Sequence, residues 1–282
     1  MPVFHRVLFP VDMSEACTAT APFVEALVRR FAADLTLLHV MDLSPLISGW
    51  DNYASAIDTE PFRRTWRDTF SQFLVDRFEG ITVRRVLREG DPAQEVIAYA
   101  ESSNADLIMM PTHGYGLFRS LLLGSVTAKV LHAASCPVWT GAHIEETPAH
   151  LAEVKNVLCA LDFNDQAIAL MQSAAKVAQT FSAKLWLLHV LPSEGSGKRT
   201  AEDIAAETKA REKMAWMQLD ARVAAHVCLG AGDVPQVIRD AALHHEAGVV
   251  VAGRGHATET FGRLRTQVYS IIRQSPCPVI SL

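Results

Sequence analysis

The stretch that decides the expected fold is Met109-Met110-Pro111-Thr112-His113-Gly114-Tyr115-Gly116, with Gly124-Ser125-Val126-Thr127 shortly after it. An apolar run at 107–110 ends in a glycine-bearing loop, and a second glycine with a hydroxyl residue then opens an amphipathic segment at 126–134. This order predicts a strand, a loop and the start of a helix. Such a junction exposes backbone N–H groups and the positive end of a helix dipole, which suits a phosphate group. A turn followed by a helix cap gives the same pattern without a ligand.

The chain also repeats itself. The run at 6–12, Arg-Val-Leu-Phe-Pro-Val-Asp, returns at 156–162 as Asn-Val-Leu-Cys-Ala-Leu-Asp, and Leu-Leu-His-Val at 37–40 returns at 187–190. Gly-Asp at 90–91 recurs at 232–233, and Cys-Pro-Val at 136–138 recurs at 277–279. We interpret this pattern as a tandem duplication with a linker near 144–152. The predicted domains are residues 1–144 and 153–282.

Each half alternates short apolar runs with segments of helical periodicity. In the first half we expect strands at 7–11, 35–40, 81–87, 107–110 and 138–140, with helices at 14–31, 61–78, 92–100 and 126–134. The second half gives strands at 157–161, 185–190, 223–228, 248–251 and 278–281. Strands that are apolar on both faces and separated by helices imply a parallel sheet covered on both sides. The predicted fold class is α/β, with two tandem, doubly wound, five-stranded parallel-sheet domains.

Composition narrows the range of partners and compartments. The formal net charge is -5 and basic residues are not clustered, so we expect neither nucleic acid nor a membrane surface as a partner. No apolar run approaches the roughly 20 residues of a membrane span, and the first residues lack the pattern of a signal peptide, so a cytoplasmic location is expected. Five cysteines without C-x-x-C spacing predict buried free thiols, with no metal site supplied by the protein alone.

The candidate site follows from the predicted sheet. In a doubly wound sheet, ligands lie beyond the carboxyl ends of the strands where the strand order reverses. The residues that close the first, second and fourth strands are Asp12, Val40 and Met110 with Pro111, and these ends should face one crevice. Asp12 equally fits a turn or N-cap, and apolar residues such as Val40 fit the core of any such fold.

These residues resemble the universal stress protein family in its tandem form, over essentially the whole chain. Nucleotide-binding members of that family carry Gly-x-x-Gly, nine residues, and then Gly-Ser or Gly-Thr. Gly114, nine residues and Gly124-Ser125 match this spacing, whereas Pro111 replaces the first glycine and removes an N–H donor. The resemblance implies a fold like that of the adenine nucleotide alpha hydrolases. It also implies antiparallel pairing of the two fifth strands, which would make one chain a monomeric pseudo-dimer, and a homodimer of chains is the other state expected.

The resemblance further implies ATP, or ADP or AMP, as the ligand, with Mg²⁺ as an optional companion. Asp12 and the backbone of Val40 would approach adenine or ribose, Pro10 and Val11 would line the floor, Met110 would pack on the nucleoside, and the backbone of Pro111 would pass nearby. The residues expected around the phosphates are His113, Gly114, Gly124, Ser125, Val126 and Thr127. From the residues alone, His113 also fits an ordinary loop histidine, and Thr127 fits a cap of its own helix.

The second half departs further from the family pattern. Alignment backward from Cys277 places residues 252–255 on 111–114, and Arg265-Thr266 on Gly124-Ser125. An arginine side chain would fill the volume where backbone should meet phosphate, so we expect weak or absent nucleotide binding here. In the alternative, Arg254 and Arg265 supply charge to a displaced phosphate. The residues of this possible weak second site are Asp162, Val190, Arg254, Gly255, Arg265 and Thr266.

The functional hypothesis is a stress-response regulatory protein that binds an adenine nucleotide in the first domain. Occupancy of that site would modulate the interaction with an as yet unknown protein partner. One alternative is a slow ATPase or autophosphorylating protein in which Ser125 or Thr127 attacks or positions the γ-phosphate. Catalysis of phosphoryl transfer usually needs a metal with cationic groups, and no matching lysine and carboxylate set is evident, so this alternative ranks lower. A scaffold that has lost nucleotide binding is the third hypothesis.

Overall fold

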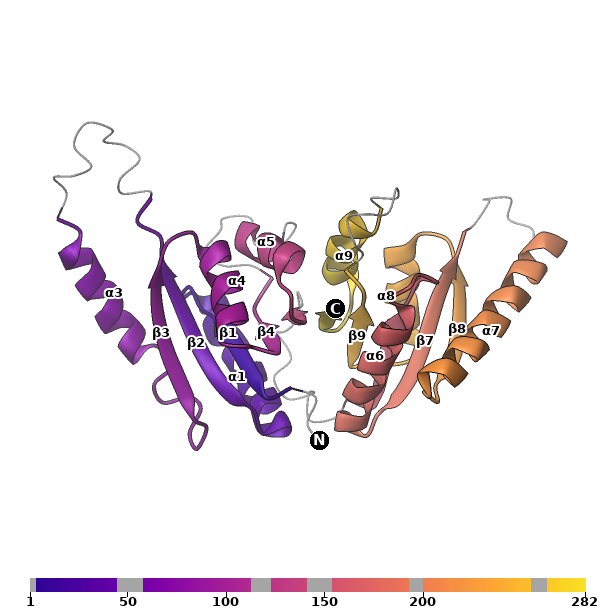
Figure 1. Cartoon of the computed structure of the whole chain (residues 1–282), viewed down its shortest axis with the longest axis horizontal. Coiled ribbons are helices and arrows are strands. Elements are labelled where there is room, and N and C mark those ends of the chain that lie inside the picture. The colour runs from indigo at the N-terminus through magenta and orange to yellow at the C-terminus, as the bar shows by residue number, and fades with distance from the viewer. Residues whose placement is uncertain (1–3, 45–57, 113–122, 141–153, 193–199, 255–262) are drawn as a thin grey trace. The chain divides into compact units, whose positions relative to one another are not determined.

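The computed structural model of the chain describes residues 4–44, 58–112, 123–140, 154–192, 200–254 and 263–282, with side chains in the last range from 267. The chain divides into two compact units, mainly Pro2–Trp139 and Ala149–Leu282. Figure 1 labels most of the elements of both. The predicted pairing of the two fifth strands concerns the placement of one unit relative to the other, and it stays a prediction.

The first unit alternates strands and helices from one end to the other. In chain order its elements are β1 (Arg6–Pro10), α1 (Glu15–Phe31), β2 (Asp34–Met41), α3 (Glu60–Gln72), β3 (Val83–Glu89), α4 (Pro92–Ser102), β4 (Leu107–Met109), α5 (Ser125–Ala133) and β5 (Val138–Thr140). The strands lie in the order β3-β2-β1-β4-β5, and every pairing is parallel. The order reverses between β1 and β4, so right-handed crossovers put α1 and α4 on opposite faces.

The second unit repeats this arrangement. Its elements are β6 (Asn156–Ala160), α6 (Ala167–Phe181), β7 (Lys184–Leu191), α7 (Ala201–Ala221), β8 (His226–Ala231), α8 (Val234–His244), β9 (Val249–Ala252), α9 (Arg263–Gln274) and β10 (Val279–Ser281). The strand order is β8-β7-β6-β9-β10, again parallel throughout. The predicted fold class, two tandem doubly wound five-stranded α/β domains, is therefore confirmed.

The repeated Gly-Asp pair has a structural cause in both units. Gly90 has φ +146° and Gly232 has φ +126°, a conformation that side chains disfavour. The amide of Gly90 donates to the carbonyl of Met41 (3.1 Å), which turns the chain at the end of β3. Asp91 then caps α4 by accepting a hydrogen bond from the Gln94 amide (2.9 Å), and Asp233 caps α8 in the same way. The pair thus carries the chain from each third strand into the helix that crosses back over the sheet.

The core of the first unit contains an aromatic cluster. Trp139 is fully buried, with its ring centroid 5.8 Å from that of Phe23 and 6.2 Å from that of Phe31. The five cysteines are free thiols; four are buried, and Cys228 is half-buried. Among the described residues, no helix has both the length and the apolar character needed to span a membrane.

Some predicted boundaries were wrong. The helix predicted at 61–78 ends at Gln72, because Phe73 is extended and Leu74 and Phe78 have positive φ. Phe78 is nevertheless buried, so the chain turns back to bring its ring inside rather than extending the helix. The strands predicted at 81–87 and 223–228 begin two and three residues later, as β3 and β8.

Candidate functional site

The carboxyl ends of β1, β2 and β4 meet at one edge of the first sheet. Parallel register places Pro10 beside Leu38 and Leu8 beside Ile108. The amide of Val11 donates to the carbonyl of Leu38 (2.8 Å), so pairing continues one residue past β1. The strand ends that carry Pro10, Val11, Val40 and Met110 are thereby brought together where the strand order reverses, the usual place for a ligand in such folds.

Asp12 fixes the start of α1. Its Oδ1 atom accepts hydrogen bonds from the Ser14 amide (3.0 Å) and the Cys17 thiol (3.1 Å). Burial, and then the adjacent Asp12 carboxylate, raise the pKa of the Cys17 thiol, so Cys17 stays protonated and donates. The turn role that the sequence offered for Asp12 is thus present in the structure. Its Oδ2 atom makes no hydrogen bond to any other described residue, and its predicted approach to a nucleoside stays a prediction.

His39 is a positioning residue that the sequence analysis missed. Its Nδ1 atom lies 2.8 Å from the carbonyl oxygen of Val11, and the side chain is buried. In the second unit, Nδ1 of His189 lies 3.0 Å from the carbonyl oxygen of Leu161. Each imidazole holds the chain just after the first strand of its unit. The repeated Leu-Leu-His-Val was the signal that could have revealed this role.

The corner between β4 and α5 is closed by two hydrogen bonds. The amide of Gly124 donates to the carbonyl of Thr112 (2.8 Å), and the buried Thr127 hydroxyl donates to the carbonyl of Pro111 (3.2 Å). Gly124 is the N-cap of α5, so the amides of residues 125–127 have no acceptor within the helix. Because the Thr127 hydroxyl is used here, a phosphate contact by Thr127 would involve its backbone N–H.

Lys129 of α5 forms an ion pair with the start of α4. Nζ of Lys129 is 3.1 Å from Oδ2 of Asp91, the N-cap of α4, and both side chains are partly exposed. The backbone N–H of Gln94, and then the Lys129 ammonium, lower the pKa of the Asp91 carboxyl. This pair joins the start of α4 to the middle of α5, and the sequence analysis did not single it out.

Several predicted site residues lie outside what the structure describes. His113, Gly114 and Gly255 fall in undescribed segments, and of Arg265 and Thr266, in the first turn of α9, only the backbone is described. Among the described residues, no group of three His, Cys, Asp or Glu side chains could hold a metal ion.

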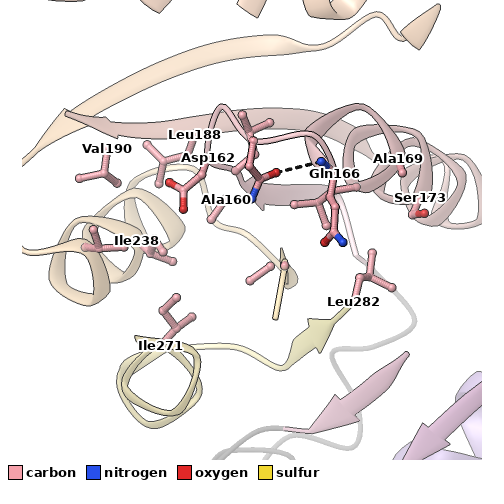
Figure 2. A pocket seen from close by; sticks show the side chains of 16 residues that line it. Ala160, Asp162, Gln166, Ala169, Ser173, Leu188, Val190, Ile238, Ile271 and Leu282 are labelled. Atoms are coloured by element: carbon pink, nitrogen blue, oxygen red, sulfur yellow. Dashed lines mark hydrogen bonds between the residues drawn. The ribbon is translucent and has the colours of Figure 1, made fainter. Parts of the chain in front are cut away.

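The second unit has a cavity of about 270 Å³ at the carboxyl ends of β6 and β9. Asp162 and Val190, two of the residues proposed for a weak second site, line it together with residues of α6, α8 and α9. Figure 2 shows Ala160 and Leu188 beside it on one side and Ile271 on the other. Arg254 is half-buried, and its amide donates to a carboxyl-terminal oxygen of Leu282 (2.7 Å).

Strand register corrects the alignment of the two halves. Val7 pairs with Leu107 in the first unit, and Val157 pairs with Val249 in the second. This equates Met110 with Ala252, Pro111 with Gly253 and Thr112 with Arg254. The alignment counted back from Cys277 was therefore one residue out at this strand, because the second half is one residue shorter between β9 and β10. Gly253, and not Ala252, stands where the first half has Pro111.

These features define a class of protein: a single chain with two doubly wound α/β domains. The universal stress protein family model matches residues 4–140 and 153–281, and the chain therefore belongs to the universal stress protein family. A universal stress protein of Methanocaldococcus jannaschii is 27% identical over 137 residues, which is 48% of this chain and 81% of that protein. One of Synechocystis is 32% identical over 140 residues, 48% of this chain and 84% of that protein. The crystal structure of a universal stress protein from Archaeoglobus fulgidus has a TM-score of 0.68 at 23% identity, covering 98% of this chain and 97% of that one.

Proposed function

We propose that the first domain binds an adenine nucleotide, ATP or its ADP and AMP relatives, at the carboxyl ends of β1, β2 and β4. The observation that carries this proposal is the corner between β4 and α5. There, the amides of residues 125–127 lack helical acceptors, and hydrogen bonds from Gly124 and Thr127 hold the helix start at the end of β4. Helix N-termini of this kind bind phosphate through backbone N–H groups and the helix dipole.

The remaining residues of the proposed site have separate parts. Pro10, Val11 and Met110 are buried and would provide an apolar surface for the base. Oδ2 of Asp12 could accept a hydrogen bond from a ribose hydroxyl. The exposed Ser125 hydroxyl is the described group suited to meet Mg²⁺ carried on the phosphates, since Mg²⁺ is often held mainly by substrate phosphates.

Calorimetry with ATP, ADP and AMP tests this proposal. Gly124→Arg places in the first domain the residue that the alignment from Cys277 sets opposite Gly124, and it should weaken ATP binding at least about tenfold, or about 1.4 kcal/mol. Gln72→Arg, on the exposed side of α3, adds the same charge elsewhere and should leave the affinity unchanged. Wild type that shows no heat and no thermal shift with any of the three nucleotides would refute the proposal. Phosphate release above a buffer control would favour the ATPase alternative.

We further propose that nucleotide occupancy alters the surface offered to a protein partner. The nucleotide would join β4 and α5 through its phosphates, and the Lys129–Asp91 pair connects α5 to α4. Hydrogen exchange with and without ATP should then show protection at α4 as well as at α5. Protection confined to residues 124–127 would contradict this part of the proposal.

A further inference from the structure

The cavity of the second domain is lined by side chains smaller than their counterparts in the first domain. Helices α1 and α6 end at Phe31 and Phe181, and a left-handed residue caps each one. This fixed offset of 150 residues equates Phe23 with Ser173. The same offset in the first strands equates Pro10 with Ala160. Together with the strand register, this offset shows that four lining residues are smaller than their counterparts. Ser173 replaces Phe23, Ala160 replaces Pro10, Ala252 replaces Met110 and Gly253 replaces Pro111.

The counterparts in the first domain are larger and buried. Phe23 is 1% exposed and packs edge-to-face on Trp139, and Met110 is 5% exposed. In the second domain the position of Trp139 is taken by Ile280, so two aromatic side chains are lost from the same side of the sheet. The loss of the Phe23 ring at Ser173 leaves space for a group about the size of a phenyl ring. Leu170 stands where the first domain has Thr20, which makes this wall more apolar.

The carboxylate at the cavity has also lost its internal partners. In the first domain Asp12 accepts from the Cys17 thiol and from the Ser14 amide. The equivalents of Cys17 and Ser14 are Ala167 and Asn164, and Ala167 has no donor on its side chain. Asp162 is exposed and makes no hydrogen bond to another residue within the described ranges. Figure 2 shows its carboxylate beside Val190 at the cavity.

We propose that the second domain binds an arylalkylamine instead of a nucleotide. The aromatic ring lies against Ser173, Leu170 and Gly253 in the space that Phe23 fills in the first domain, and the ammonium group pairs with Asp162. The volume of about 270 Å³ corresponds to roughly nine water molecules at about 30 Å³ each, and it lies just below the usual range for ligand pockets. A compact ligand matches that volume, and a mainly apolar wall with the Asp162 carboxylate matches an amine that carries one ring.

Titration of the full chain with tyramine tests the proposal. Tyramine should bind with a stoichiometry of one, and 4-ethylphenol, which has the ring but no amine, should bind at least about tenfold more weakly. Ser173→Phe restores the residue of the first domain and should weaken tyramine binding at least about tenfold. Lys176→Phe adds the same ring at an exposed position of α6 and should leave the affinity unchanged. If Ser173→Phe fails to fold, Ala252→Met fills the cavity from β9 and takes its place.

Three results would overturn the proposal: no binding of tyramine at millimolar concentration, equal binding by wild type and the filled variants, or displacement of tyramine by adenosine. The proposal is independent of nucleotide binding by the first domain. Tyramine binding should therefore persist in Gly124→Arg, and ATP binding should persist in Ser173→Phe.

Discussion

Replacement of His39 by asparagine should remove a pH dependence of stability from the first domain. The Val11 carbonyl can only accept a hydrogen bond, so Nδ1 of His39 donates to it and Nε2 is unprotonated in the neutral ring. Nε2 is buried, and it has no hydrogen-bond partner among the described residues. Protonation of the ring would therefore bury an unpaired N–H and a positive charge. Burial accordingly lowers the pKa of His39.

The sign of the effect follows from the two states. The unfolded chain binds the proton near pH 6.5, whereas the folded chain binds it only at lower pH. The free energy of unfolding therefore falls as pH drops below about 6.5 and stops falling below the folded pKa. The slope in this window reaches about 1.4 kcal/mol per pH unit for one proton. In His39→Asn the amide nitrogen can still donate to Val11, and this contribution to the slope disappears.

Hydrogen exchange read by mass spectrometry is a suitable assay, because it follows β1 and β2 separately from the second unit. The opening free energy of these strands should depend on pH between 5.5 and 6.5 in wild type and markedly less in His39→Asn. His189→Asn is the matched control in the second unit and should leave β1 and β2 unchanged. Equal slopes in wild type and His39→Asn would refute the reasoning.

Three further outcomes are expected. Thr127→Val leaves the Pro111 carbonyl without its hydroxyl donor and should cost the first domain about 1–3 kcal/mol, as measured by urea unfolding, whereas Thr127→Ser should restore most of it. Asp91→Ala should cost about 1 kcal/mol at pH 7 through loss of the α4 cap. The folded protein lowers the pKa of the Asp91 carboxyl below the unfolded value of about 3.9. The stability difference between wild type and Asp91→Ala should therefore shrink as pH falls through the folded pKa, and thermal melts at pH 7 and pH 3 would show this. In native protein at pH 7.5, N-ethylmaleimide should modify half-buried Cys228 before fully buried Cys159, because burial raises their pKa values to about 11 and about 12. Peptide mass spectra that show the reverse order would contradict this expectation.

The fold could be predicted because its determinants are local and occur twice. The apolar runs that form β1 and β6 are each followed by a segment with helical periodicity, and the Gly-Asp pairs mark the starts of α4 and α8. Burial on both faces gives such strands an unbroken apolar pattern, which distinguishes a covered parallel sheet from an open one. The order of strands then follows from short, right-handed connections.

The site was less predictable because its contacts join residues distant in sequence. The hydrogen bond from His39 to Val11 spans 28 residues, and that from Thr127 to Pro111 spans 16. The equivalence of Pro111 with Gly253 required strand pairing, because counting from Cys277 crosses a one-residue deletion. The significance of Ser173 depends on knowing that Phe23 packs on Trp139, a contact that no local pattern encodes.

Because the two α/β units belong to one polypeptide, they are always present in equal number. A pair of separate subunits would exchange or dissociate on dilution, whereas covalent linkage keeps the two units, with their different side chains at the strand ends, together at any concentration. Serine stands at position 173 of the second unit, whereas the first unit keeps Phe23 at the equivalent position. The side chains at one strand edge could thus change without altering those at the other.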